Sequence, residues 1–368
     1  MIKLRELLAE EKLRLAIPSD IRQLYTLFKK NGYQLYVVGG AVRDAILGKK
    51  PKDFDLATDA KPDEVEKIAK QGKFKTVDVG KSFGVVIVNG HEIATFRKDI
   101  GKGRRPDAVD YTDIAGDVKR RDLTINALFY DMGRGEIVDL VGGIKDLKKK
   151  KIRTVGKPEQ RFDEDPLRKL RAVRFAGSVG GRMTKDTWAA LKKNSNISGV
   201  SSERIRDEFI KGITKAKSVT NYLKMIKTLG MFKQIFPGLS ILTSNQKTND
   251  YKLQIAYMLQ TNGADKVKKK LNSLKYTKQE STDIWFLIKI SNPREVIDNL
   301  PSFKNLQKNT KLTTSQIKQW AKINSNKDIL KVWNWKLSVT SNDAKAKGWL
   351  GKGIGDYMKK KEEELFLS

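Results

Sequence analysis

The spacing of hydrophobic residues divides the chain into a mixed front part and a helical rear part. In the first 155 or so residues, helix-like and strand-like spacings follow one another. After about Gly156 the strand signals fade, and helical periodicity continues to the C-terminus. We therefore expect an α+β fold, in which a mixed sheet with helices precedes an all-α region. The elements predicted in the front part are helices over residues 20–31, from Gly40 to about Gly48 and over 62–70, and strands over 35–38, 53–57, 85–88 and 93–96.

Length and composition fit a globular protein of two or three domains, with 368 residues, 39% of them hydrophobic and 32% charged. A polar, glycine-bearing stretch at residues 98–107 is the best candidate for a mobile loop. No stretch approaches the roughly 20 uncharged apolar residues of a membrane-spanning helix, so we expect no membrane partner. Residues 1–15 mix glutamates with leucines, unlike a signal peptide, and we expect a cytoplasmic protein.

The net charge points to a polyanionic partner. Lys and Arg total 74 against 43 Asp and Glu, which leaves a formal charge of +31. Binding to nucleic acid releases a counterion for each neutralised phosphate, although solubilising surface lysine is the simpler alternative. The chain has no cysteine and one histidine, His91, so thiolate and histidine metal sites are nearly excluded. Any metal must be held by oxygen, which favours Mg²⁺ or Mn²⁺.

Asp53-Phe54-Asp55 is the first candidate for chemistry. Side chains alternate along a strand, so both carboxylates lie on one side and Phe54 faces the core. Adjacent carboxylates repel each other unless a cation joins them, and a hard divalent metal does so well. Nucleotidyl transfer needs this pair, because one ion activates the attacking 3′-hydroxyl and another neutralises the triphosphate. The same spacing also occurs on exposed strands that have no function.

Three further features lie near this pair in the sequence. Gly39-Gly40, between a strand and a helix, lets backbone N–H groups approach a phosphate, and Arg43 in the first helical turn can reach the same phosphate. Glu92 is a candidate third carboxylate on an otherwise apolar strand face, with a strand-end residue reaching solvent as the alternative. His91 is more typical of a strand-end surface residue than of a catalyst.

Five motif segments then stand out in order along residues 35–210: GGAVRDAILG with DFDLATDA, RRDLTINAL, DLVGGIKDL, EDPLRKLRAVRFA and SERIRDEF. In this order they resemble motifs A to E of the class II tRNA nucleotidyltransferase/poly(A) polymerase family. Beyond them the resemblance is general, to a helical and basic region. It implies a DNA polymerase β-type nucleotidyltransferase head over residues 1–155. A helical neck for base recognition over 156–220, a helical body over 221–295 and a tRNA-binding helical tail over 296–368 would follow.

The resemblance also implies a function, which is untemplated addition of C, C and A to the 3′ end of tRNA from CTP and ATP by two-metal nucleotidyl transfer. The implied partner is the acceptor end of tRNA, and no obligatory protein partner is evident. The metal pair falls on Asp53 and Asp55, with Glu92 as the further catalytic candidate. The implied nucleotide-binding residues are Gly39, Gly40, Arg43, Arg121, Asp122 at the ribose, Asn126, Asp165 and Arg168 at the base, and Arg171 and Arg174.

Helical spacing qualifies the base-reading assignment. Asp165, Arg168, Arg171 and Arg174 recur every three residues, which turns each by 60° around a helix. We expect Asp165 and Arg168 to address one base edge, and Arg171 and Arg174 to contact phosphate or form salt bridges between helices. An acidic acceptor beside an arginine donor matches the Watson–Crick edges of both cytosine and adenine, but not those of uracil and guanine.

Three alternatives stay open. Poly(A) polymerase shares the head, but residues 80–84, GKSFG, differ from the G-[RK]-[RK]-F element typical of bacterial poly(A) polymerases, whereas Leu128-Phe129-Tyr130 leans toward them. An enzyme that adds only CC or only A is the second alternative, because the spacer at 98–103, before Arg104-Arg105-Pro106, is shorter than expected. The third alternative is an inactive tRNA-binding protein.

Overall fold

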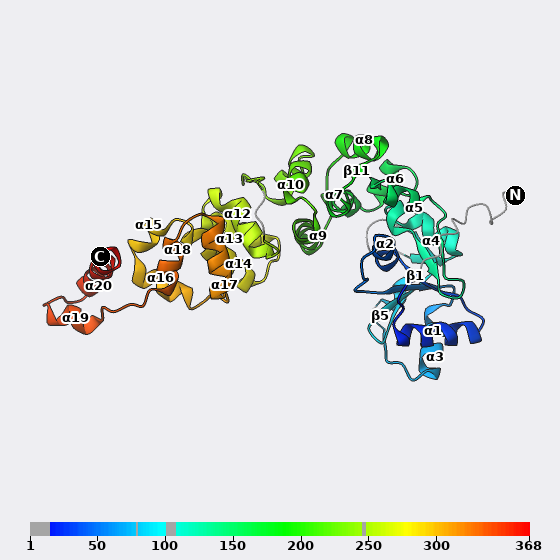
Figure 1. Cartoon of the computed structure of the whole chain (residues 1–368), viewed down its shortest axis with the longest axis horizontal. Helices are drawn as coiled ribbons and strands as arrows, with labels where there is room; N and C mark the ends of the chain where they lie inside the picture. Colours follow the sequence, from blue (N-terminus) through cyan, green and yellow to red (C-terminus); the bar gives the residue numbers. More distant parts are fainter. Residues whose placement is uncertain (1–14, 79, 101–107, 245–247) are drawn as a thin grey trace. The chain divides into compact units, whose positions relative to one another are not determined.

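The computed structural model describes residues 15–78, 80–100, 108–244 and 248–368 (Figure 1). The chain divides into two compact units, residues 1–200 and residues 201–368. The first unit combines strands and helices, and the described residues of the second form helices alone. The expected α+β fold class is therefore confirmed. The domain boundaries expected at residues 155, 220 and 295 stay predictions.

A seven-stranded sheet forms the centre of the first unit. Its strand order is β3-β4-β5-β2-β1-β8-β9, with β2 and β5 parallel and the other neighbours antiparallel. The strands are β1 (Leu35–Val38), β2 (Asp55–Thr58), β3 (Thr76–Val77), β4 (Val85–Val88), β5 (His91–Thr95), β8 (Phe129–Asp131) and β9 (Glu136–Val138). The four predicted strands are all present. The other three were not predicted, because two or three residues are too few to show an alternating pattern.

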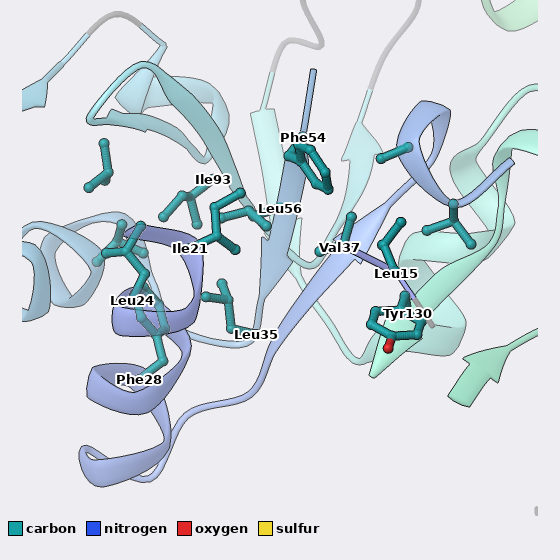
Figure 2. Packing of buried hydrophobic residues seen from close by; sticks show 14 of the residues in the cluster. Leu15, Ile21, Leu24, Phe28, Leu35, Val37, Phe54, Leu56, Ile93 and Tyr130 are labelled. Carbon is teal, nitrogen blue, oxygen red and sulfur yellow. The ribbon is translucent and has the colours of Figure 1, made fainter. Parts of the chain in front are cut away.

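Helices α1 (Ser19–Lys30) and α3 (Pro62–Gln71) pack their apolar sides on one face of this sheet. In α1 the buried residues Ile21, Leu24 and Phe28 recur at helical spacing. They meet Leu56 of β2 and Ile93 of β5, which are partners in the sheet register (Figure 2). This face of the sheet is thus closed, and functional side chains must lie at its edge or on the other face.

The other face carries a smaller apolar cluster with an aromatic centre. The rings of Tyr36, Phe96 and Phe129 lie 6.1 Å apart, centroid to centroid, in all three pairs. Next to them come the hairpin of β6 (Arg97–Ile100) and β7 (Ala108–Tyr111), and helix α4 (Ile114–Arg120). Residues 98–100 of the expected loop therefore belong to a strand. The rest of that loop, including Arg104-Arg105-Pro106, lies outside the described residues.

The described residues of the first unit also form further helices, turns and short strands. They are α2 (Gly40–Ile46), the 3₁₀ turns η2 (Lys81–Phe83) and η3 (Thr124–Asn126), α5 (Gly143–Lys148), β10 (Lys151–Ile152), α6 (Pro158–Glu164), α7 (Leu167–Val179), β11 (Arg182–Met183) and α8 (Lys185–Lys193). The expectation that strands end near Gly156 is wrong, because β11 pairs in parallel with β10. A strand of two residues depends on pairing with its neighbour, and two residues are too few to show a periodic pattern in the sequence.

The second unit is built from short helices packed around buried aromatic residues. They are α9 (Ser202–Lys215), α10 (Val219–Thr228), α11 (Met231–Ile235), α12 (Tyr251–Leu259), η4 (Gln260–Asn262), α13 (Ala264–Ser273), α14 (Lys278–Ile290), α15 (Pro293–Ile297), α16 (Leu300–Gln307), α17 (Thr314–Ile323), α18 (Asp328–Asn334), α19 (Ser341–Ala346) and α20 (Gly353–Leu367). Trp320 is fully buried, and its indole N–H donates to the carbonyl of Leu287 at 2.8 Å. Within the described part of the chain, no helix has both the length and the apolarity to cross a bilayer.

The DLVGG segment forms a compact cap on α5. The buried carboxylate of Asp139 accepts from the backbone N–H groups of Val141, Gly143 and Ile144 at 2.8–3.2 Å. Gly143 packs so closely on η3 that a Cβ there would overlap the carbonyl oxygen of Thr124. The glycine is thus required by the close approach of α5 to the turn that carries Asn126.

We predict that Gly143→Ala destabilises this part of the first unit by roughly 1–3 kcal/mol, because the added methyl group overpacks against backbone that cannot move aside. Hydrogen–deuterium exchange of peptides covering residues 122–155 should be faster in the variant. Gly355→Ala is the matched control, since a Cβ at Gly355 in α20 meets no atom within 4 Å. Equal exchange in Gly143→Ala and the unmodified chain would contradict the prediction.

Candidate active site

Asp53 and Asp55 reach solvent at the beginning of β2, and Phe54 between them is buried in the sheet core. The expected alternation of faces is therefore present, although Asp53 precedes the strand. Asp55 is the register partner of Val38, the last residue of β1. The carboxylate pair thus lies beside the point where the chain leaves β1 into Gly39-Gly40.

The carboxyl of Asp55 lies in a negative environment. Surrounding protein atoms raise its pKa although the side chain reaches solvent, and the neighbouring carboxylates of Glu92 and Asp53 raise it further against the opposing charge of Arg121. Leu56 and Ile93 are register partners, so Asp55 and Glu92, one residue earlier on each parallel strand, share a face of the sheet. The site therefore carries unneutralised negative charge that a cation would stabilise.

The donor set fits a magnesium-type ion held by two carboxylates. Among the described residues, no three Asp, Glu or His side chains gather closely enough to hold a metal together. Glu92 therefore acts on Asp55 through its charge and does not complete a ligand set in this structure. A pair suffices for Mg²⁺, which is usually bound through one or two carboxylates, with water and substrate phosphates as the remaining ligands.

Arg43 extends from α2, directly after the Gly39-Gly40 turn, and is held in place by two polar partners. Its Nη1 donates to Oδ1 of Asn126 at 2.7 Å, and its Nε and Nη2 donate to Oδ1 of Asp44 at 3.1 and 3.0 Å. Gly39 has φ of +67°, a conformation that favours glycine. The turn therefore places Arg43 beside Asn126 of η3.

Arg121 ends α4 and is fixed by a buried acid that the sequence analysis did not single out. Its Nε and Nη2 donate to Oδ2 of Asp117 at 3.1 and 2.9 Å, and its guanidinium carbon lies 4.5 Å from the centre of the Phe129 ring. Burial opposes the ionisation of Asp117, but Arg121 and Arg120 outweigh it and lower the pKa of this carboxyl. The signal was available, because an acid four residues before an arginine faces it on a helix.

Asp122 connects the head segment to helix α7. It is 8% exposed; its Oδ1 accepts from Nδ2 of Asn126 at 3.1 Å, and its Oδ2 accepts from Nε of Arg171 at 2.7 Å. Burial alone would raise the pKa of Asp122, but the charge of Arg171 and these hydrogen bonds lower it to about 2. Since Asn126 also bonds Arg43, one continuous polar network runs from α2 to α7.

Asp165 does not lie on the helix that carries the arginines, so the expected four-residue helical series is wrong. Helix α6 ends at Glu164, Asp165 is extended with φ −147° and ψ 105°, and α7 begins at Leu167. The physical reason is Pro166, because a residue before proline is disfavoured in the helical conformation. The Asp165 carboxylate instead accepts from the backbone N–H of Leu167 at 3.1 Å.

Arg168 and Arg171 both have partners within the protein. Nη2 of Arg168 donates to the carbonyl of Arg120 at 2.8 Å, and its Nη1 donates to the carboxylate of Glu164. Arg171 forms a salt bridge with Asp122, which lies in the bend between α4 and η3 and not on a helix. Arg174 is buried, and its guanidinium lies over the ring of Phe175. The structure thus brings the predicted arginines to one region and holds each by a defined contact.

Comparison with known proteins gives these contacts a context. Residues 35–153 match the poly(A) polymerase head domain, and residues 182–242 match the probable RNA- and SrmB-binding site of polymerase A. The chain is 42% identical over 224 residues to a CCA-adding enzyme of Bacillus pumilus, which covers 59% of this chain and 54% of that protein. It is 47% identical over 188 residues to the CCA-adding enzyme of Bacillus subtilis, covering 49% and 46%. The chain thus spans about half the length of the curated relatives it matches.

Solved structures support the fold across nearly the whole chain. The CCA-adding enzyme of Bacillus stearothermophilus in complex with CTP aligns with a TM-score of 0.67 at 24% identity, covering 95% of this chain and 92% of that one. The Thermotoga maritima CCA-adding enzyme complexed with tRNA aligns with a TM-score of 0.64 at 21% identity, covering 95% and 91%. Residues 35–153 and 182–242 thus match two domains of class II nucleotidyltransferases of the poly(A) polymerase head type, and this chain is homologous to bacterial CCA-adding enzymes.

Proposed function

We propose that this chain is a tRNA nucleotidyltransferase that adds C, C and A to the 3′ end of tRNA from CTP and ATP, without a nucleic-acid template. The observation that carries the proposal is the exposed pair Asp53 and Asp55 beside the Gly39-Gly40 turn, in a head shared with CCA-adding enzymes. The cytoplasm, where tRNA is processed in bacteria, is the corresponding location.

Asp53 and Asp55 would hold the divalent metal, Mg²⁺ or Mn²⁺. The raised pKa of the Asp55 carboxyl supports this role, since a bound cation would relieve the repulsion from Glu92 and Asp53. When bound, the metal supplies activation of the tRNA 3′-hydroxyl and neutralises charge on the triphosphate and leaving pyrophosphate. The protein's part is to orient the two carboxylates, which the buried Phe54 between them does.

Arg43 and Arg121 would bind the triphosphate. Both guanidiniums are held by hydrogen bonds within the protein, Arg43 by Asn126 and Arg121 by Asp117. A prearranged donor loses little conformational entropy on binding, so more of its interaction energy appears as affinity. The N–H groups of the Gly39-Gly40 turn, which precedes α2, would add backbone donors at the same place.

Asp165 and Arg168 would select the base. An aspartate acceptor next to an arginine donor matches the amino group and ring nitrogen of cytosine and adenine, and leaves a carboxylate facing a carbonyl with uracil or guanine. The backbone N–H of Arg168 donates to the carbonyl of Asp165 at 2.9 Å, which ties the two residues together. Glu164 and the Arg120 carbonyl then fix the guanidinium of Arg168, which supports a rigid reading pair.

We expect magnesium-dependent incorporation of labelled CTP and then ATP into a tRNA that lacks its 3′ CCA. Two C residues followed by one A is the predicted product on a sequencing gel. Arrest after CC, or addition of A alone to a tRNA ending in CC, would select a partial enzyme. Long A tracts on unrelated RNA would select poly(A) polymerase. Binding of tRNA without incorporation of any nucleotide would overturn the enzyme proposal.

We expect Asp53→Asn and Asp55→Asn each to lower the transfer rate roughly a thousandfold or more, because each removes a metal ligand without changing side-chain shape. Affinity for tRNA, measured by filter binding, should remain within about twofold, since phosphate contacts elsewhere dominate it. Asp59→Asn is the control, an exposed carboxylate on the same segment whose acceptor for the Gln34 N–H survives as an amide oxygen. Equal loss of tRNA binding in the Asp53 and Asp55 variants would make the pair structural.

We expect Arg168→Ala to reduce the preference for CTP over UTP about tenfold or more, because the variant lacks the guanidinium that would read the base edge. The apparent affinity for the triphosphate should change less. Competition between CTP and UTP at equal concentrations measures this preference directly. Arg182→Ala, an exposed arginine in β11 of the same unit, should leave it unchanged. A preference unaltered by Arg168→Ala would refute the base-reading role.

A further inference from the structure

Three arginines meet the ring of one buried residue, Phe175 in α7. Their guanidinium carbons lie 3.9 Å (Arg174), 5.0 Å (Arg43) and 5.6 Å (Arg171) from the ring centroid. Phe175 itself is 5% exposed. Arg43 comes from the other end of the first unit's sequence, in α2, whereas Arg171 and Arg174 flank Phe175 on α7. A single ring thus gathers cations from two distant segments.

An aromatic ring can bring these three guanidiniums together. Cations at this separation repel one another, and the negative face of a phenyl ring attracts each of them. Arg43 and Arg171 already pair with the carboxylates of Asp44 and Asp122. The ring adds a further attraction for all three arginines without adding a further negative charge.

The polar contacts around the ring fix the same arrangement from outside. Asn126 bonds Arg43, and Asp122 bonds Arg171. The side chains of Arg43 and Arg171 remain 16% and 32% exposed, so part of each guanidinium faces solvent. Phe175 is therefore buried beneath the exposed parts of Arg43 and Arg171, where it supports these side chains but would not itself contact a bound anion.

We propose that Phe175 is a positioning residue that holds Arg43, Arg171 and Arg174 together as one binding surface for the triphosphate of the incoming nucleotide. The proposal rests on the proposed function only in that a nucleoside triphosphate is the ligand. Neither tRNA nor the base-reading pair, Asp165 and Arg168, takes part in this role of Phe175. The effect of Phe175 must therefore be the same for CTP and for ATP.

The test is calorimetric titration of the full chain with CTP and with ATP, in the presence of Mg²⁺ and without tRNA. Phe175→Leu keeps a buried apolar side chain and removes the ring. We expect this variant to bind CTP and ATP each about tenfold more weakly than the unmodified chain. Phe162→Leu is the matched control: Phe162 is 2% exposed in α6, whereas the ring that Arg43, Arg171 and Arg174 approach is that of Phe175. This control should bind CTP as the unmodified chain does. If the melting temperature of Phe175→Leu lies well below that of Phe162→Leu, Phe175→Met is used in the titration instead, because the flexible methionine side chain fills the same space without a ring.

A double-variant cycle separates positioning from packing. If Phe175 acts through Arg43, then Phe175→Leu combined with Arg43→Lys must weaken CTP binding by less than the product of the two single effects. Effects that multiply, or CTP binding by Phe175→Leu equal to that of the unmodified chain, would overturn the inference and leave the proposed function standing. Failure of the unmodified chain to bind either nucleotide would instead overturn the proposed function.

Discussion

The candidate active site depends on the ion pair between the buried carboxylate of Asp122 and Arg171. A buried carboxylate is costly unless it is paired and hydrogen-bonded, and Asp122 meets both conditions. Its partners lie on different elements: Asn126 on η3 and Arg171 on α7. Because Asn126 in turn bonds Arg43, the position of one carboxylate fixes the arginines of α2 and α7 relative to each other. Without it, Arg171 would lose its acidic partner and Asn126 would lose an acceptor.

The site has two regions of opposite charge. Carboxylates gather at the start of β2, where burial and the charges of Glu92 and Asp53 raise the pKa of Asp55. Three guanidiniums gather around Phe175, and two of them are also paired with Asp44 and Asp122. A metal–triphosphate complex carries both charges, with the cation suited to the first group and the phosphates to the second. In the proposed function, this kind of ligand would offset the repulsion within each region, which favours binding of metal and nucleotide together.

The sequence predicted those features that depend on neighbours along the chain. The alternation at Asp53-Phe54-Asp55 and the helix after Gly39-Gly40 follow from local geometry, and both are present. The three-residue spacing of charged residues predicts Asp165 on the helix of the arginines, but Pro166 keeps Asp165 out of the helical conformation, and its effect is readable from the sequence. Contacts between distant segments could not be predicted. The approach of Arg43 to Phe175 and Asn126 exists only after α2, η3 and α7 have packed together.

Chemistry and nucleotide choice are assigned to different segments of the same unit. The carboxylate pair sits at the start of β2, whereas Asp165 and Arg168 lie at the junction of α6 and α7. Two contacts join α7 to the end of α4 and the bend that follows it: Arg168 donates to the Arg120 carbonyl, and Arg171 pairs with Asp122. A poly(A) polymerase and a CCA-adding enzyme need the same carboxylates, so the pair cannot determine the product. What determines it would act through the α6–α7 junction, through the segment after β6, or through the helical unit, if that unit binds the RNA as proposed. Of these, the α6–α7 junction is the one next to the ion pair, because Arg171, the partner of Asp122, lies on α7.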